Sequence, residues 1–284
     1  MIVVTGATGQ LGRLVVEGLL AKVPAAELAV AVRSPEKAAD WAGRGVAVRE
    51  VDYGRPGTLA AAFGAGDRVL LISGSEVGAR VPQHTAVVEA AKAAGVARLV
   101  YTGVLGGDEA GFALADEHKA TEAVIRASGL PYTFLRNGWY TENYTANAAA
   151  AIEHGTVLGS SGDARIATAS RQDFADAAVA VLTGEGHEGR AYELSGDTAW
   201  SFSEYAAELA AASGRPVAYR NVGAGEHRAA LVGAGVPEVF ADILVDVDAA
   251  IARGELARDR GVLSGLIGRP TTPLAETVKA ALAG

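Results

Sequence analysis

Three evenly spaced glycines near the start of the chain are the clearest sign of a binding site in this sequence. Gly6, Gly9 and Gly12 follow an apolar run at residues 1–5 and overlap a helical pattern at residues 11–20. A strand, tight turn and helix of this kind lets backbone N–H groups approach a pyrophosphate with no side chain between them. Gly6 suits the turn, Gly9 the close approach and Gly12 the packing of helix against strand. We therefore expect dinucleotide phosphates to bind at Gly6, Ala7, Thr8, Gly9, Gln10, Leu11 and Gly12.

The glycine spacing narrows the class of binding site. It is Gly-x-x-Gly-x-x-Gly, which differs from the Gly-x-Gly-x-x-Gly of most nucleotide-dependent dehydrogenases and is typical of extended and atypical short-chain dehydrogenases. The alternative is an ordinary glycine turn, because the chain contains 36 glycines. The apolar strand before the turn and the helix after it favour the nucleotide site.

Arg33 follows a second apolar strand at residues 28–32 and is expected to choose between NAD and NADP. NAD enzymes place a carboxylate about 20 residues beyond the glycines, where it binds the ribose 2′-hydroxyl. Here that place carries a guanidinium, which suits a 2′-phosphate through paired charged hydrogen bonds. We predict NADPH as the cofactor. The alternative is a surface arginine beside a helix that Ser34 caps and Pro35 begins.

Two further polar segments lie at the ends of predicted strands. Asp52 and Tyr53 follow the strand 46–51, where an aspartate in short-chain dehydrogenases accepts from the adenine amino group. Asp-Tyr-Gly is equally favourable as a turn, so both interpretations stay open. Ser73-Gly74-Ser75 closes the strand 68–73 and is expected to border the pyrophosphate and the nicotinamide ribose. An ordinary polar loop is the alternative there.

The usual acid of short-chain dehydrogenases is absent. Those enzymes carry Tyr-x-x-x-Lys on the helix after the fifth strand, and the tyrosine protonates the alkoxide that hydride addition creates. On that helix the residue four before Lys119 is Ala115, and the residue four before His118 is Leu114. The tyrosine acid is therefore missing from this helix. A lone histidine such as His118 usually has a structural role.

Alternating strands and helices in the first half of the chain predict an α/β fold. Such alternation implies right-handed crossovers and a doubly wound parallel sheet of the NAD(P)-binding Rossmann type. Besides the first strand, we predict strands at 28–32, 46–51, 68–73, 99–102 and 132–135, and helices at 11–20, 59–63, 82–94 and 114–127.

Beyond Arg136 the pattern is less regular and predicts a smaller, mostly helical C-terminal lobe. We expect helices at 139–152, 171–182, 203–213, 226–233, 239–253 and 274–282, strands at 190–194 and 217–219, and a loop at 155–162. The expected division is an NADP-binding domain over residues 1–151 and a substrate lobe over 152–284. Part of 160–195 is expected to return to the sheet.

Composition excludes several function classes. The chain of 284 residues has no cysteine, which excludes disulfides, thiolate catalysis and cysteine-ligated metals. A net charge of −8 disfavours nucleic acid and anionic membranes as partners. The five histidines form no ligand pair on one helix, so no metal site is predicted. With no targeting segment or membrane span in the sequence, a cytoplasmic protein is expected. Its oligomeric state is not predicted.

Motifs along the whole chain resemble the NmrA-like atypical short-chain dehydrogenases. The segment Arg136-Asn137-Gly138-Trp139-Tyr140, with Glu142-Asn143-Tyr144, is the most specific of these motifs. The others are Thr5–Gly12, Arg33, Ile72–Gly78, Ala115–His118 and Gly268–Pro273. The resemblance implies that Asn137, Gly138, Tyr140, Glu142 and Asn143 lie beside the nicotinamide end of the cofactor. It also places His118 where related aryl reductases carry a catalytic lysine. The alternative roles are helix capping by Asn137 and core packing by Trp139.

Within that family the motifs are most similar to NADPH-dependent quinone reductases, and the missing tyrosine fits this substrate class. Hydride addition to a quinone leaves a delocalised phenolate-type anion that water can protonate. Catalysis then needs mainly close positioning of the two reactants, with Asn137, His118 and Lys119 as donors near the quinone oxygen. The alternatives are a non-catalytic NAD(P)-sensing regulator and a reductase of another aromatic substrate.

Overall fold

The computed structural model describes residues 1–258 and 261–283, which form two compact units. Unit 1 comprises Met1–Asp108, Asp116–Asn137 and Arg171–Glu193. Unit 2 comprises Glu109–Ala115, Gly138–Ser170 and the chain from Leu194 onward. Both units are therefore discontinuous in sequence. The assignment of residues 1–151 to the cofactor and of residues 152–284 to the substrate stays a prediction.

Unit 1 is built on a seven-stranded sheet in the order β3-β2-β1-β4-β5-β6-β9. All pairings among β1 to β6 are parallel, from Ile2↔Leu28 in the first pair to Val104↔Asn137 in the last. The strands are β1 (Ile2–Thr5), β2 (Leu28–Val32), β3 (Ala47–Glu50), β4 (Arg68–Leu71), β5 (Arg98–Val104), β6 (Tyr132–Asn137) and β9 (Arg190–Leu194). The strand order reverses between β1 and β4, where open α/β sheets bind ligands at the carboxyl ends of their strands. The predicted doubly wound Rossmann fold is confirmed.

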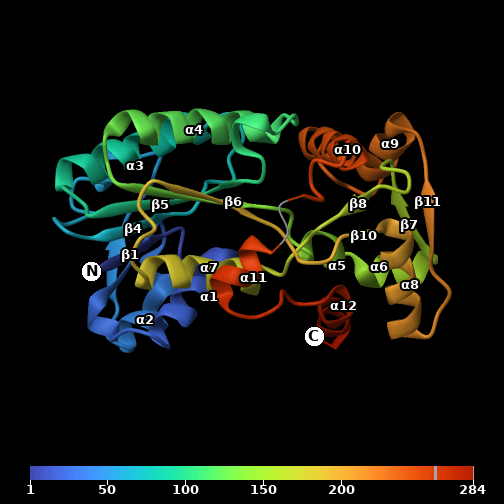
Figure 1. Ribbon diagram of the computed structural model, residues 1–284, viewed down its shortest axis with the longest axis horizontal. Coiled ribbons are helices and arrows are strands. Elements are labelled where there is room, and N and C mark those ends of the chain that lie inside the picture. The colour runs from blue at the N-terminus through green and yellow to red at the C-terminus, as the bar shows by residue number, and fades with distance from the viewer. Residues whose placement is uncertain (259–260, 284) are drawn as a thin grey trace. The chain divides into compact units, whose positions relative to one another are not determined.

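Helices cover both faces of this sheet. Helices α3 and α4 lie on one face, and α1, α2 and α7 lie on the other (Figure 1). Their bounds are α1 (Gln10–Leu20), α2 (Ala39–Gly43), α3 (Arg80–Ala94), α4 (Leu114–Ser128) and α7 (Arg171–Thr183). Strands β1, β2 and β5 are buried at every residue, as expected for mainly apolar strands of a sheet that is covered on both faces. Short 3-10 turns lie at Ala25–Glu27, Pro35–Ala38, Pro56–Thr58 and Gly107–Glu109.

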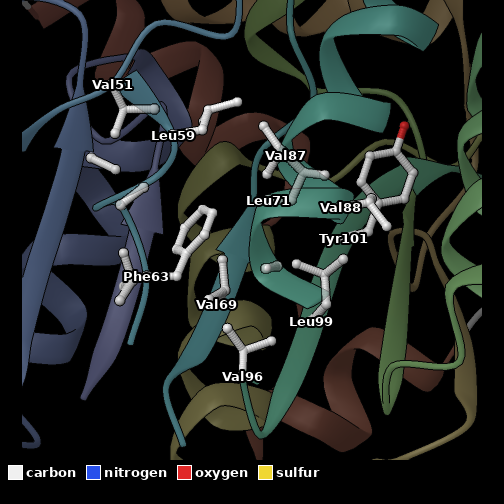
Figure 2. Packing of buried hydrophobic residues seen from close by; sticks show 14 of the residues in the cluster. Val51, Leu59, Phe63, Val69, Leu71, Val87, Val88, Val96, Leu99 and Tyr101 are labelled. Carbon is white, nitrogen blue, oxygen red and sulfur yellow. The ribbon is translucent and has the colours of Figure 1, made fainter. Parts of the chain in front are cut away.

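A hydrophobic cluster packs β4 and β5 against α3 (Figure 2). Leu71, Leu99 and Tyr101 come from the strands, and Val87 and Val88 come from the helix. All five are fully buried. Complete burial of such a side chain contributes roughly 1.5–3 kcal/mol. The carboxyl ends of β4 and β5 therefore rest on a densely packed support.

Unit 2 is mostly helical, with two small sheets. Strand β7 (Thr156–Gly159) pairs in parallel with β11 (Ala218–Asn221), and β8 (Arg165–Ile166) pairs antiparallel with β10 (Trp200–Ser201). The helices are α5 (Glu142–Thr145), α6 (Ala148–His154), α8 (Phe202–Ser213), α9 (Ala224–Gly233), α10 (Glu238–Ala252), α11 (Val262–Ile267) and α12 (Leu274–Ala283). Among the described residues, no helix is long and apolar enough to cross a membrane.

Three predicted elements were wrong. The helix expected over 139–152 is instead two helices, α5 and α6, separated at residues 146–147. The first of them begins only at Glu142, because Tyr140 forms a β-bridge with Ala169. The glycine-rich segment 155–162 is not a simple loop, since Thr156–Gly159 forms β7. In place of a helix at 59–63, a 3-10 turn spans Pro56–Thr58.

Two residues expected to begin or cap a helix have other positions. Asn137 caps no helix, because it is the last residue of β6. Pro35 begins a 3-10 turn, and the side chain of Ser34 makes no capping hydrogen bond there.

Candidate functional site

The glycine turn between β1 and α1 has the tight geometry expected from its sequence. Gly6 has a positive φ of 59°, and its carbonyl accepts from the Gly9 N–H at 3.0 Å. A Cβ at Gly12 would lie 2.4 Å from the Gly6 oxygen and 2.7 Å from the Ala7 Cα, so α1 packs here backbone against backbone. A Cβ at Gly9 would meet the same oxygen at 3.2 Å.

The start of α1 suits an anion. Its N-cap, Gly9, makes no side-chain capping bond, and the first turn carries no acidic residue. The early N–H groups of a helix need an acceptor and carry a partial positive charge. Gly6, Gly9 and Gln10 are exposed at this point, Thr8 is half-buried, and Ala7, Leu11 and Gly12 are buried.

The segment that follows β4, residues 72–78, forms a loop that we call the β4 loop. Side chains from neighbouring strands hold its first residues. The Ile72 N–H donates to Oγ1 of Thr5 at 3.2 Å, and the Ser73 N–H donates to Oγ1 of Thr102 at 2.9 Å. Thr5 and Thr102 are buried and lie at or near the carboxyl ends of β1 and β5. Two hydroxyls in otherwise apolar strands thus fix the start of the loop.

His84 of α3 holds the next residue. Its Nε2 accepts from the Gly74 N–H at 3.0 Å, so Nδ1 carries the proton and donates to Oγ1 of Thr121 at 3.0 Å. Thr121 donates in turn to the Glu117 carbonyl at 2.8 Å. Burial, with the charge of Arg80 second, lowers the pKa of His84 to about 3. His84 is therefore neutral near pH 7, and its tautomer is set by the backbone of the β4 loop.

An ion pair holds the far end of the β4 loop. Nε of Arg80 donates to the Gly74 carbonyl at 2.8 Å, and Nη1 of Arg80 lies 3.0 Å from Oε2 of Glu117. The other carboxylate oxygen of Glu117 accepts from the Gly78 N–H at 3.0 Å. The backbone that includes the predicted Ser73-Gly74-Ser75 contact is therefore held at both ends.

Arg33 lies directly after β2, as predicted, and its side chain is 69% exposed. Its Nη1 lies 3.1 Å from Oε1 of Glu76, a residue of the β4 loop.

Tyr53 lies shortly after β3. Burial raises the pKa of Tyr53 well above its usual value, and the Tyr53 hydroxyl donates to Oγ1 of Thr5. Arg33, Tyr53 and the β4 loop all follow strands whose carboxyl ends meet at one edge of the sheet.

Asp52 is engaged in its own turn. Its carboxylate accepts from the Gly54 N–H at 2.9 Å and from Nε of Arg55 at 3.0 Å. These two hydrogen bonds, in that order, hold the pKa of Asp52 below its usual value. The turn interpretation accounts for both contacts, and the adenine contact stays a prediction.

His118 and Lys119 are neighbours on α4 but have different surroundings. His118 is 7% exposed, and its Nδ1 lies 2.7 Å from the Tyr101 hydroxyl. Burial, followed by the charges of Arg80 and His84, lowers the pKa of His118 to about 3, whereas burial raises that of Tyr101. The two groups share one hydrogen bond, whose direction depends on the tautomer of His118. Lys119 is half-buried, and its Nζ lies 3.4 Å from Oδ1 of Asp116.

Asn137, at the end of β6, is 5% exposed, and its carbonyl accepts from the Leu105 N–H at 2.9 Å. The preceding residue, Arg136, anchors this strand end. Its guanidinium donates to both oxygens of Glu122, at 2.9 and 2.6 Å, and to Glu193 at 2.7 Å. Glu122 is 1% exposed. A buried ion cluster therefore fixes the backbone beside Asn137.

The other residues predicted near the nicotinamide belong to unit 2. The Gly138 N–H donates to the Leu194 carbonyl at 2.7 Å, and a Cβ at Gly138 would lie 2.9 Å from that oxygen. Tyr140 forms the bridge to Ala169, and Glu142 and Asn143 begin α5. Glycine at position 138 is thus required by packing within unit 2.

Sequence reasoning missed the residues that support the β4 loop, which are Thr5, Thr102, His84, Arg80 and Glu117. Their contacts join positions up to 67 residues apart in the chain. The sequence feature that could have indicated this support is a threonine at or near the end of a mainly apolar strand. No group of three or more His, Asp or Glu residues that could hold a metal occurs within residues 1–258 and 261–283.

Comparisons with known proteins identify the family to which this chain belongs. The NAD(P)H-binding family matches residues 6–185. The chain is 50% identical over 278 residues to quinone oxidoreductase 2 of Escherichia coli strain K12, covering 98% of this chain and 97% of that protein. The crystal structure of the E. coli NADPH-dependent quinone oxidoreductase complexed with NADPH matches with a TM-score of 0.96 and 49% identity, over 99% of this chain and 100% of that one.

A more distant relative carries the NmrA-like name. The NmrA-like family domain-containing oxidoreductase flvB of Aspergillus flavus is 30% identical over 290 residues, covering 97% of this chain and 93% of that protein. The predicted resemblance is therefore confirmed, and the chain belongs to the NAD(P)H-binding family, among its NmrA-like oxidoreductases.

Proposed function

We propose that this protein uses NADPH to reduce small quinones to hydroquinones by direct hydride transfer, without a flavin. The observation that carries the proposal is the 50% identity, along almost the whole chain, to a quinone oxidoreductase. A structure of such an enzyme with NADPH matches the fold at a TM-score of 0.96.

The residues of unit 1 fit this cofactor. The first turn of α1 offers N–H groups with no side-chain cap, and the glycine turn leaves backbone exposed at Gly6 and Gly9. Both features suit a pyrophosphate. The exposed guanidinium of Arg33 suits the 2′-phosphate that distinguishes NADPH from NADH. Asp52, Tyr53 and Ser73-Gly74-Ser75 are proposed to contact the rest of the dinucleotide.

The proposed catalytic groups orient the substrate and donate hydrogen bonds. NADPH supplies the hydride when bound. Neutral His118 is proposed to donate through Nε2–H, with the Tyr101 hydroxyl donating to its Nδ1. Asn137 and Lys119 are proposed as further donors to the developing oxyanion. His118 is not an acid at neutral pH, because its pKa is about 3. Quinones suit a site with this property, since their reduced anion is delocalised and water can protonate it.

The remaining parts of the proposal rest on the family resemblance. Asn137, Gly138, Tyr140, Glu142 and Asn143 are proposed to contact the nicotinamide end of the cofactor. The NADP-binding domain is proposed to span residues 1–151 and the substrate lobe residues 152–284, with part of 160–195 returning to the sheet. A cytoplasmic location is proposed as well, consistent with the absence of cysteine.

The test is NADPH oxidation by purified protein that shows no flavin in its visible spectrum. Benzoquinone should be reduced well above the uncatalysed rate, whereas a matched aliphatic ketone should react little, because no positioned acid protonates an alkoxide. Asn137→Ala should lower kcat more than it weakens NADPH binding. Tight NADPH binding with no turnover above background would contradict the proposal and favour a dinucleotide-sensing regulator.

A further inference from the structure

Glu76 lies on a loop whose backbone is fixed from both sides. Thr102 and His84 hold residues 73 and 74 at 2.9 and 3.0 Å, and Glu117 holds residue 78 at 3.0 Å. The supporting side chains of Thr102 and His84 are buried. The position of the Glu76 backbone opposite the end of β2 is therefore determined by the fold.

The two carboxylate oxygens of Glu76 have different partners. Oε2 accepts from Nε2 of Gln83 at 2.8 Å, and Oε1 lies 3.1 Å from Nη1 of Arg33. Gln83 thus keeps the carboxylate turned toward the α3 side of the loop, with its other oxygen on the guanidinium. Arg33 is the residue proposed above to bind the 2′-phosphate of NADPH.

The Arg33–Glu76 ion pair can be broken and replaced by contacts with other groups. The side chains of Arg33 and Glu76 are 69% and 53% exposed, so water can replace either partner. An exposed pair of this kind shifts an equilibrium by up to about fivefold. A phosphate that takes the guanidinium must displace Glu76 and then lies near a carboxylate of the same sign. NADH brings no 2′-phosphate and meets neither obstacle.

We infer that Glu76 is a specificity-determining residue, which competes with the 2′-phosphate for Arg33 and so reduces the preference of the site for NADPH over NADH. The inference rests on the proposed role of Arg33. Two opposite charges then set the ratio of NADPH to NADH affinity. Arg33, which follows β2, attracts the 2′-phosphate, and Glu76, on the β4 loop, repels it. Because no buried group is involved, the selectivity can change without disturbing the fold.

The experiment measures Kd for NADPH and for NADH, by calorimetry on the full chain, in the wild type and in Glu76→Gln. We expect Glu76→Gln to bind NADPH about three- to fivefold more tightly and NADH within about twofold of the wild type. The gain should shrink at 0.5 M salt, because screening weakens exposed charge interactions. Glu89→Gln is the matched control, since it removes the same charge from an exposed position on α3. It should leave the ratio of the two constants unchanged.

A second variant, Arg33→Ala, tests separately whether Arg33 binds the 2′-phosphate of NADPH. If Arg33→Ala leaves NADPH affinity intact, the assignment of Arg33 to the 2′-phosphate fails, whatever Glu76 does. If Arg33→Ala weakens NADPH alone, that assignment holds and Glu76→Gln decides the inference. If Glu76→Gln has the same ratio of NADPH to NADH dissociation constants as the wild type, or binds NADPH more weakly, Glu76 does not compete with the 2′-phosphate. In the Arg33→Ala background the gain from Glu76→Gln should fall, because only direct repulsion is left to remove.

Discussion

Acidification from pH 7 to pH 5.5 should lower the free energy of unfolding, and replacing His84 by Gln should remove part of that loss. His84 and His118 are both buried, and burial is the main reason that each has a pKa of about 3. In the unfolded chain a histidine has a pKa near 6.5. Below pH 6.5 the unfolded state therefore binds a proton that the folded state excludes.

The size of the effect follows from these pKa values. Stability that depends on a neutral histidine is fully present above about pH 6.5 and decreases continuously as the pH falls toward about 3. Between pH 7 and pH 5.5 one such histidine costs about 1.3 kcal/mol, and His84 with His118 cost about 2.5 kcal/mol together. Carboxyl groups titrate mainly below this range and contribute little to the difference.

The assay is urea unfolding at both pH values for the wild type, His84→Gln and His154→Gln. Glutamine places an amide oxygen near the position of Nε2, so it can still accept from the Gly74 N–H. His84→Gln should lose about 1.3 kcal/mol less than the wild type on acidification. His154 is exposed, and its replacement is the matched control. An equal pH-dependent loss in His84→Gln and the wild type would refute a buried, neutral His84.

Two further predictions concern packing and charge in unit 1. Gly12→Ala should destabilise the protein by about 1–3 kcal/mol in urea unfolding, because its Cβ would lie 2.4 Å from a backbone oxygen. Gly9→Ala, with one contact at 3.2 Å, should cost much less, and equal losses would contradict this packing. Glu122→Ala should cost about 3–5 kcal/mol, because it leaves Arg136 partly unpaired in a buried cluster. Glu50→Ala, in an exposed ion pair, should change stability far less, and similar values for both carboxylates would count against the buried cluster.

The sequence predicted unit 1 well because its signals are local. The apolar runs that became β1, β2 and β5 are buried at every residue, and their periodicity differs clearly from that of the helices between them. The glycine turn was also recognisable, since two of its glycines have a steric reason that lies in the turn itself. Gly6 needs its positive φ, and Gly12 has no room for a Cβ.

Unit 2 was harder to predict because its elements depend on distant partners. Strand β7 has glycine and threonine at its ends and resembles a loop, and it becomes a strand by pairing with β11, some sixty residues later. The alanine-rich sequence after Trp139 favours a helix, yet the bridge from Tyr140 to Ala169 keeps its beginning extended. Local propensity gave the wrong answer at both places because tertiary pairing overrides it.

The supports of the β4 loop illustrate a different limit. His84 is an ordinary position in an alanine-rich helix until the fold places it against Gly74 and Thr121. Its neutral state then has a functional consequence, because no buried imidazole changes charge beside the proposed cofactor site between pH 5 and pH 8. The charges that can change partners, Arg33 and Glu76, lie instead at the surface. Different residues thus hold the loop backbone and carry the exposed charges. If Arg33 and Glu76 set cofactor preference as inferred above, substitutions at these two positions should change that preference and leave the β4 loop intact.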